Sequence, residues 1–264
     1  MDRRMKEEEE EDIFYSPENM EASDNEENGR NDEDEKTMLS HLRATLEKQD
    51  PSCKEIDDLT LRRFLRARDL DVEKASRMFI KYLTWRRSFV PKGSISVSEI
   101  INQLNDNKIY MQGTDTRGCP VLVVFGAKHF PSKGGTEELK RLVVFAFDKL
   151  CSRIPDGQEK LTIIVDLQGY GYSNSDVRGY TAILSILQEY YPERLGKVFM
   201  IHVPYIFMTV WKIIYPFIDK NTKKKFVFIE SKKLREALLE EINESQLPDI
   251  YGGKLKLVPI QDST

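Results

Sequence analysis

Residues 198–218, VFMIHVPYIFMTVWKIIYPFI, form an apolar stretch of 21 residues in which only His202, Thr209 and Lys212 are clearly polar. Length alone would let such a stretch cross a bilayer as a helix. However, Pro204 follows a strand-like run, and Pro216 and Lys212 interrupt the remainder, so a spanning helix would contain two breaks and a charge. The stretch therefore predicts a strand over Val198–Val203, a turn, and a helix from about Tyr205 to Phe217.

The predicted helix has bulky apolar side chains on all of its faces. A helix of this kind needs apolar neighbours on every side. One interpretation is a core helix that is fully buried. The other is a helix that faces a lipid cavity on its inner side and a membrane on its outer side. The sequence leaves both interpretations open.

The regions around this stretch alternate between buried strands and amphipathic helices. Three further apolar, β-branched runs predict strands, and the segments between them have helical periodicity. Because strands and helices alternate, the predicted fold class is α/β with a largely parallel sheet. The predicted strands are Pro120–Phe125, Leu161–Leu167 and Phe226–Ile229, and the predicted helices are Thr136–Cys151, Ser175–Tyr191 and Ser231–Ile242.

An all-helical unit precedes the α/β region. Between Thr37 and Phe89, apolar residues recur at spacings of three and four, as in Leu39, Leu42 and Leu46. Asp71 stands where it can cap the last helix of this unit, which ends before Pro91. We expect this helical unit to pack against the sheet.

The N-terminal 36 residues differ from the rest of the chain in charge. They contain 16 acidic and 5 basic side chains, which leaves 28 acidic and 35 basic side chains in the remaining 228 residues. Few apolar residues and strong self-repulsion predict that residues 1–36 are a disordered tail. The composition favours a tail that keeps the protein soluble, and a tail that folds back on the basic body as an electrostatic cover is the alternative.

Several classes of chemistry lack the residues that they need. The three cysteines and three histidines are widely spaced, which predicts neither a disulfide framework nor a bound metal. Neither a phosphate-binding glycine loop nor a Gly-x-Ser-x-Gly nucleophile motif follows a strand. Asp166 ends a strand where catalytic acids often lie, but the sequence favours a capping or turn role for it. The dispersed basic residues do not indicate nucleic-acid binding. Free thiols and the acidic N-terminus favour a cytoplasmic location.

Six motifs in order along the chain resemble the CRAL-TRIO lipid-binding family, closest to its Sec-fourteen-type phosphatidylinositol transfer branch. They extend over about 220 residues, in other words everything except the acidic tail. The motifs are Thr60–Arg68, Asp115–Val121, Ile164–Gly169, Tyr190–Gly196, Tyr215–Asp219 and Leu247–Gly253.

The resemblance implies an N-terminal helical region at residues 37–90 and a lipid-binding domain at residues 91–258, with a hydrophobic pocket that a mobile gate helix closes. The ligand implied is phosphatidylinositol, held at its headgroup by Arg68, Glu193, Thr222 and Lys225. A cation and a hydroxyl suit a phosphodiester, and a carboxylate suits inositol hydroxyls. The residues expected in the acyl-chain pocket and gate are Phe199, Ile201, Phe207, Met208, Val210, Trp211, Ile214 and Phe217.

The sequence departs from the family pattern at the positions that bind phosphatidylcholine. The family's Ser-x-Thr pair is replaced by Leu161 and Ile163, its tyrosine by Leu122, and Thr162 lies on the opposite strand face. We therefore do not expect phosphatidylcholine binding. Three alternatives remain: the protein carries phosphatidylinositol alone, it senses phosphatidylinositol, or its pocket accepts a different hydrophobic second ligand such as a sterol or a tocopherol-like molecule.

The expected activity is non-enzymatic lipid binding with transfer or presentation, and an α/β lipid hydrolase is the remaining alternative. The resemblance implies a monomer with no cofactor and no catalytic residue. Lys212 and Lys223–Lys225 would hold the basic body transiently against anionic membranes.

Overall fold

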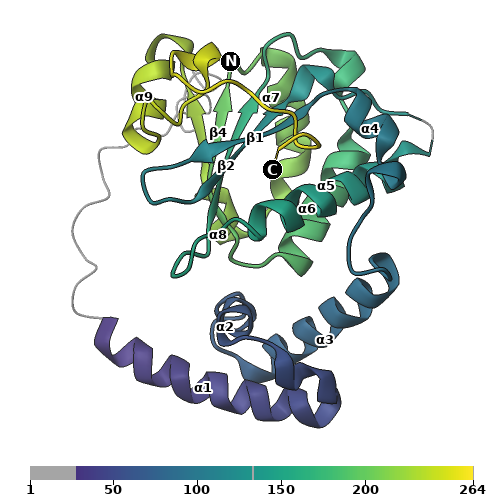
Figure 1. Cartoon of the computed structure of the whole chain (residues 1–264), viewed down its shortest axis with the longest axis vertical. Helices are drawn as coiled ribbons and strands as arrows, with labels where there is room; N and C mark the ends of the chain where they lie inside the picture. The colour runs from purple at the N-terminus through teal and green to yellow at the C-terminus, as the bar shows by residue number, and fades with distance from the viewer. Residues whose placement is uncertain (1–27, 133, 264) are drawn as a thin grey trace, which may run out of the picture.

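The computed structural model describes residues 28–132 and 134–263. Figure 1 shows helices α1, α2 and α3 gathered on one side of the molecule, next to a sheet with its own flanking helices. Two hydrophobic clusters cover the two faces of the sheet, and a third holds the N-terminal helices together. The predicted α/β class is confirmed.

The N-terminal helices are α1 (Asn28–Gln49), α2 (Asp58–Arg66) and α3 (Val72–Phe89), with a short turn η4 (Pro51–Glu55) after the first. Asp71 accepts a hydrogen bond from the Lys74 amide at 2.9 Å, as the predicted cap of α3. The apolar faces of the three helices meet in a core of their own, which contains Leu42, Leu46, Leu61, Phe64, Leu65 and Phe79.

Helix α1 begins earlier than the sequence predicts. The prediction of a disordered tail extends to residue 36, but residues 28–36 form the first turns of α1. Glu35 explains part of the difference, because its Oε1 lies 2.9 Å from Arg66 Nη2 on α2. This ion pair ties the start of α1 to its neighbour. Residues 1–27 lie outside the described residues, so their predicted disorder stays a prediction.

The sheet has five strands in the order β1-β2-β3-β4-β5. Strands β2 to β5 are parallel, and β1 pairs with β2 in the antiparallel sense. The sequence did not predict β1, whose pattern is broken by a bulge between Met111 and Thr114, where Gly113 has a φ of +52°. The strands are β1 (Ile109–Thr114), β2 (Pro120–Phe125), β3 (Leu161–Asp166), β4 (Leu195–Ile201) and β5 (Phe226–Ile229).

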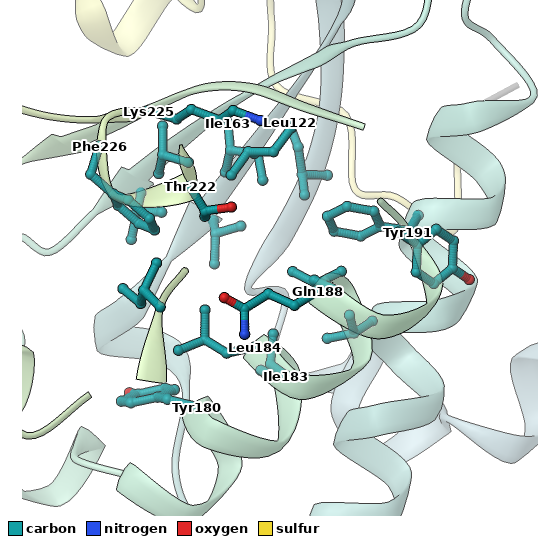
Figure 2. Close-up of a pocket in the computed structure, with 18 of the residues that line it drawn as sticks. Leu122, Ile163, Tyr180, Ile183, Leu184, Gln188, Tyr191, Thr222, Lys225 and Phe226 are labelled. Atoms are coloured by element: carbon teal, nitrogen blue, oxygen red, sulfur yellow. The ribbon is translucent and has the colours of Figure 1, made fainter. Parts of the chain in front are cut away.

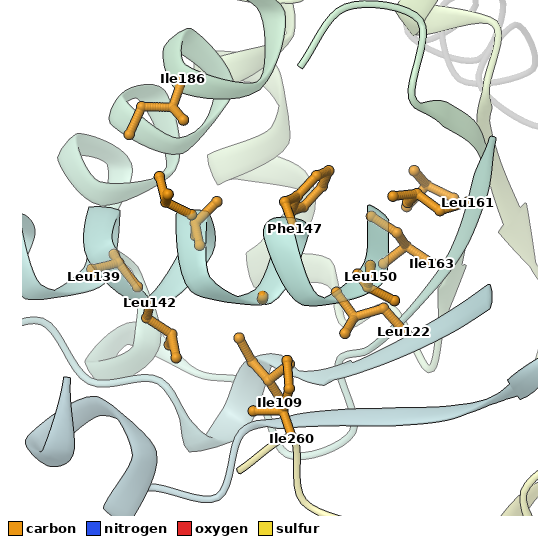
Figure 3. Close-up of a cluster of buried hydrophobic side chains, with 14 of the residues drawn as sticks. Ile109, Leu122, Leu139, Leu142, Phe147, Leu150, Leu161, Ile163, Ile186 and Ile260 are labelled. Carbon is orange, nitrogen blue, oxygen red and sulfur yellow. The ribbon is translucent and has the colours of Figure 1, made fainter. Parts of the chain in front are cut away.

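Helices cover both faces of the sheet. Helices α5 (Gly135–Cys151), α6 (Val177–Tyr190) and α7 (Tyr205–Ile214) contribute to the cluster on one face, and α9 (Leu234–Glu241) to the cluster on the other. Figure 3 shows Leu150 of α5 beside Leu122 and Ile163 of the sheet. The short elements are α4 (Ile101–Asn105), α8 (Lys220–Lys223), η5 (Val97–Glu99), η6 (Gly126–Lys128), η7 (Tyr172–Asn174), η8 (Tyr215–Phe217), η9 (Ser231–Lys233) and η10 (Asp249–Tyr251).

The apolar stretch 198–218 folds as a strand, a turn and a helix, as predicted. Strand β4 ends at Ile201, Pro204 precedes α7, and the helix narrows into η8 at Tyr215 because Pro216 follows. Among the described helices, none is both long enough and apolar enough to cross a bilayer.

Candidate functional site

A cavity of about 550 Å³ lies between the sheet and helices α5, α6 and α7. One row of side chains across the sheet forms its floor, since Leu122, Ile163, Val198 and Phe226 are register partners on four neighbouring strands and all line the cavity. Figure 2 shows Ile183 and Leu184 of α6 across from this row. The walls are therefore apolar over most of their area.

Of the eight residues predicted for the pocket and gate, three line the cavity and the others do not. Phe207, Trp211 and Ile214, spaced by four and three residues on α7, line the cavity. Val210 is buried and Met208 half-buried, but both pack beside the cavity and do not line it. Phe217 is 61% exposed at the end of η8, so it lies on the outer surface.

The prediction that Phe199 and Ile201 line the pocket is wrong, because both side chains face away from the cavity. Both belong to the cluster on the α9 face of the sheet, whereas their neighbours Val198 and Met200 line the cavity. Side chains alternate between faces along a strand, but β4 is apolar on both faces and its sequence does not identify the inner one.

The four residues predicted to hold a headgroup all line one end of the cavity, which we call the mouth. Arg68 lies in the turn between α2 and α3, and Thr222 lies on α8. Glu193 lies two residues before β4, and Lys225 directly precedes β5. The mouth is therefore at the amino ends of the parallel strands, and it brings together segments up to 157 positions apart in sequence.

Glu193 is held between two cations at the mouth. Its Oε2 lies 2.6 Å from Lys160 Nζ and 3.9 Å from Lys225 Nζ, and its φ of +58° is unusual for a residue other than glycine. Burial opposes its ionisation, but the Lys160 hydrogen bond and the two positive charges outweigh burial and lower the pKa of Glu193. Burial also lowers the pKa of Lys225, which Glu193 offsets only in part.

Two side chains at the mouth, Arg68 and Thr222, have donors that bond to no side chain within the described residues. Within the described residues, Arg68 has no carboxylate partner, and its guanidinium donates only to the backbone oxygen of Ala67, at 2.7 Å. In the same described part of the chain, the hydroxyl of Thr222 forms no hydrogen bond, although its backbone amide is bonded to Asp219. A guanidinium without a carboxylate partner and a hydroxyl without a hydrogen bond can receive an anionic or polyhydroxyl group.

The opposite end of the cavity is also polar, but its groups bond to one another. We call it the closed end. Lys108 Nζ donates to Gln103 Oε1 (2.6 Å) and Asp106 Oδ2 (2.9 Å) and lies 3.3 Å from His129 Nδ1. His129 Nε2 lies 3.0 Å from Asp176 Oδ2. Both ring nitrogens of His129 are therefore occupied, and neither is left to activate a nucleophile.

Asp166 has a structural role of the kind that the turn interpretation predicts. One carboxylate oxygen accepts from the Gln168 amide and lies 2.9 Å from His202 Nδ1, while the other accepts from the Tyr251 hydroxyl at 2.8 Å. Burial and the Asp166 charge raise the pKa of Tyr251. Asp166 thus joins the end of β3 to the C-terminal segment. Across residues 28–132 and 134–263, no cluster of His, Cys, Asp and Glu could hold a metal ion.

Leu122 and Ile163 occupy the floor of the cavity, where the sequence places the departure from the family pattern. Leu161 is buried in the same cluster. Thr162 lies on the opposite face as predicted, and its hydroxyl donates to Asp115 Oδ2 at 2.9 Å. The floor therefore presents hydrocarbon at these positions.

Sequence reasoning missed the contributions of α5 and α6 to the cavity, and also Gln188. The apolar spacing of Leu139, Leu142 and Val143 on α5 could have indicated an inward face. Gln188 carries no such signal, because a single glutamine on an amphipathic helix is ordinary. It nevertheless lines the cavity, and Figure 2 shows it beneath Thr222.

Comparisons with known proteins agree with this architecture. The model of the CRAL/TRIO domain matches residues 104–253, and that of the CRAL/TRIO N-terminal domain matches residues 5–81. A solved structure, that of Sfh5, superposes with a TM-score of 0.61 at 20% identity over 83% of this chain and 85% of that chain. The latter likeness concerns the fold alone.

Curated relatives extend over most of the chain. The Sec14 cytosolic factor of Schizosaccharomyces pombe is 32% identical over 83% of this chain and 82% of the relative. The SEC14 cytosolic factor of Candida glabrata is 31% identical over 86% and 80%. The phosphatidylinositol transfer protein CSR1 of Eremothecium gossypii is 29% identical over 76% of this chain and 48% of its own length. Together with the two domain matches, these similarities show that the chain belongs to the CRAL-TRIO family.

Proposed function

We propose that the protein is a non-enzymatic, monomeric lipid carrier that binds phosphatidylinositol and transfers it between membranes or presents it at one. The main support for this proposal is the mouth, where the guanidinium of Arg68 and the hydroxyl of Thr222 have no side-chain partner among the described residues. Together with Lys225, they suit a phosphodiester, and the carboxylate of Glu193 suits the inositol hydroxyls.

The apolar cavity supports a ligand with hydrocarbon chains. A diacyl lipid has on the order of 30 methylenes, and at about 0.8 kcal/mol each their exposure to water would cost roughly 25 kcal/mol. A carrier has to offer surroundings as apolar as the bilayer. The floor residues Leu122 and Ile163 and the α7 residues Phe207, Trp211 and Ile214 offer such surroundings.

Membrane contact would use the outer face of α7 and η8. Tyr205 is 86% exposed and Phe217 61% exposed, and Ile213 between them is also exposed. Lys212 and Lys220 are exposed on the same segment. Apolar groups with nearby cations favour an anionic lipid surface, and each cation contributes about 1 kcal/mol. The protein would then lie in the cytoplasm and bind membranes transiently, more weakly at high salt.

The hydrocarbon floor favours a second candidate ligand. Since Leu122 and Ile163 offer no polar group in the middle of the cavity, a sterol or a tocopherol-like molecule could occupy it. Such a ligand would not need the charged mouth. A lipid hydrolase is less well supported, because His129 and Asp166 are engaged in structural hydrogen bonds.

Mass spectrometry of the lipid that copurifies with the protein tests the proposal. We expect phosphatidylinositol, and we expect labelled phosphatidylinositol to reach acceptor vesicles chemically unchanged. A copurified sterol would support the second candidate, whereas release of fatty acid or headgroup would overturn the non-enzymatic assignment.

A further inference from the structure

Gln188, in the last turn of α6, bonds to the chain on both sides of Ile218. Its Nε2 donates to the backbone oxygen of Phe217 at 3.0 Å, and its Oε1 accepts from the backbone amide of Asp219 at 2.7 Å. Ile218, between these two residues, is 3% exposed and lines the cavity. The Gln188 amide thus fixes the segment that closes the cavity beside the mouth.

Apart from the buried side chain of Ile218, the segment that Gln188 holds has few other anchors. Helix α7 ends at Ile214, and η8 and α8 are a single turn each. Pro216 lacks a backbone donor, and Phe217 is mostly exposed. The Ile218 amide donates to the Tyr215 oxygen at 3.2 Å. Ile218 is the buried anchor of this otherwise exposed segment, so the two side-chain hydrogen bonds from Gln188 are a large share of what closes it.

The three residues after Gln188 connect to the N-terminal helices. Glu189 Oε2 lies 2.7 Å from Lys81 Nζ, and the Tyr190 ring stacks on Trp85 at a centroid distance of 3.9 Å; both partners are on α3. The Tyr191 hydroxyl donates to Asp148 Oδ1 at 2.7 Å, and the other oxygen of Asp148 pairs with Arg86 of α3. Four consecutive residues therefore link the closing segment to α3.

We propose that Gln188 is a positioning residue that latches residues 217–219 over the cavity, and that the turn 188–191 makes this latch sensitive to the position of α3. The latch itself does not depend on the proposed function, but its consequence, the control of lipid release, rests on that function. An amide side chain offers an uncharged donor and an uncharged acceptor on two neighbouring atoms, as this pair of backbone partners requires. A movement of α3 displaces the turn and weakens both hydrogen bonds.

Amide hydrogen exchange of the full chain tests the latch without any ligand. Gln188→Met keeps the side-chain length and removes both hydrogen bonds, and Gln188→Glu keeps the acceptor but loses the donor. Ser185→Ala, at an exposed position on the same helix, is the control. The Asp219 amide bonds to Gln188 itself, so its exchange rises in Gln188→Met whether or not the segment opens. The informative amides are those of Ile218 and Tyr215, because they bond to backbone oxygens.

We expect exchange at Ile218 and Tyr215 to rise about tenfold in Gln188→Met, less in Gln188→Glu, and not at all in Ser185→Ala. Unchanged exchange at both amides in Gln188→Met would overturn the latch. For the link to α3, Lys81→Ala should accelerate the same amides in the wild-type background but not in Gln188→Met. Equal acceleration in both backgrounds would overturn the coupling.

Release of pyrene-labelled phosphatidylinositol from the loaded protein to excess acceptor vesicles tests the consequence. We expect several-fold faster release from Gln188→Met than from wild type or Ser185→Ala. If none of the three proteins, wild type included, binds the probe, the proposed function is wrong. The hydrogen-exchange result then still tests the latch. If the probe loads and is released at one rate from all three proteins, the latch does not control release.

Discussion

The two ends of the cavity are built from similar residues but differ in how those residues are paired. At the closed end, Lys108 makes three close contacts and His129 uses both ring nitrogens. At the mouth, Arg68 and Thr222 have donors that bond to no side chain within the described residues. Lys225 Nζ lies 3.9 Å from the Glu193 carboxylate, which is too far for a hydrogen bond. The ends are separated by the length of a six-residue strand, about 20 Å.

This difference distinguishes a structural polar cluster from a binding one. Buried polar groups cost free energy unless they are paired, so a fully paired cluster is explained by folding alone. Donors that face a cavity and have no side-chain partner are not explained by folding alone. We therefore expect substitutions at the closed end to lower stability and substitutions at the mouth to lower ligand binding.

The largest effect is expected from Lys108→Met at the closed end. Removing the buried ammonium leaves Gln103 without its donor and the half-buried Asp106 without its cation, and should lower the free energy of unfolding by about 3 kcal/mol. Urea denaturation measures this loss. The preference among headgroups should not change in the protein that still folds. An undiminished stability would mean that the closed end is not structural.

Lys225→Ala at the mouth should act in the opposite way. Loss of a charge-assisted contact should weaken phosphatidylinositol retention by about 2 kcal/mol, roughly thirtyfold. Stability should hardly change, because burial already disfavours the charge of Lys225 and lowers its pKa. Vesicle-to-vesicle transfer is the measurement, and Lys224→Ala, next to it and exposed, is the control. Full transfer by Lys225→Ala would contradict the headgroup assignment.

A smaller effect is expected from pH at the closed end. Burial, followed by the charge of Lys108, lowers the pKa of His129 below its ordinary value of 6.5, although Asp176 and Asp106 act in the opposite direction. As the pH falls below 6.5, the unfolded chain therefore takes up a proton before the folded one, and stability decreases. Thermal denaturation between pH 7.5 and 5 should show a larger fall in Tm for wild type than for His129→Gln. Equal falls would exclude His129 as the source.

Thr222→Val should have the smallest effect. The substitution keeps the shape and removes a hydroxyl that has no partner in the described structure, so stability should be unchanged. Loss of one neutral hydrogen bond to the ligand should weaken retention by about 1 kcal/mol, roughly fivefold. Thr222→Ser should keep the wild-type value. Equal retention by Val and Ser variants would remove Thr222 from the site.

Much of the fold could be predicted from hydrophobic pattern, because buried strands and amphipathic helices differ in length and period. Strand β1 was missed, since its bulge at Gly113 breaks the alternation. Phe199 and Ile201 were assigned to the wrong face because β4 is apolar on both sides. Pattern alone identifies such a strand but not its inner face.

The mouth could not be predicted from spacing, because its residues come from four separate segments. The resemblance of the motifs to a family suggested Arg68, Glu193, Thr222 and Lys225, and the folded chain places all four around one opening. Gln188 carried neither a pattern nor a motif role. Its part depends on backbone atoms of residues 217 and 219, which only the tertiary structure brings near.

The positions of the aromatic indole rings have a practical consequence. The chain contains two tryptophans, of which Trp85 stacks on Tyr190 at the junction with α3 and Trp211 lines the cavity. Intrinsic fluorescence therefore reports on both the α3 junction and the cavity without an attached dye. With Trp211→Phe the remaining emission follows the junction, and with Trp85→Phe it follows cavity occupancy. Stopped-flow traces of the two variants would show whether the junction changes before or after the cavity is filled.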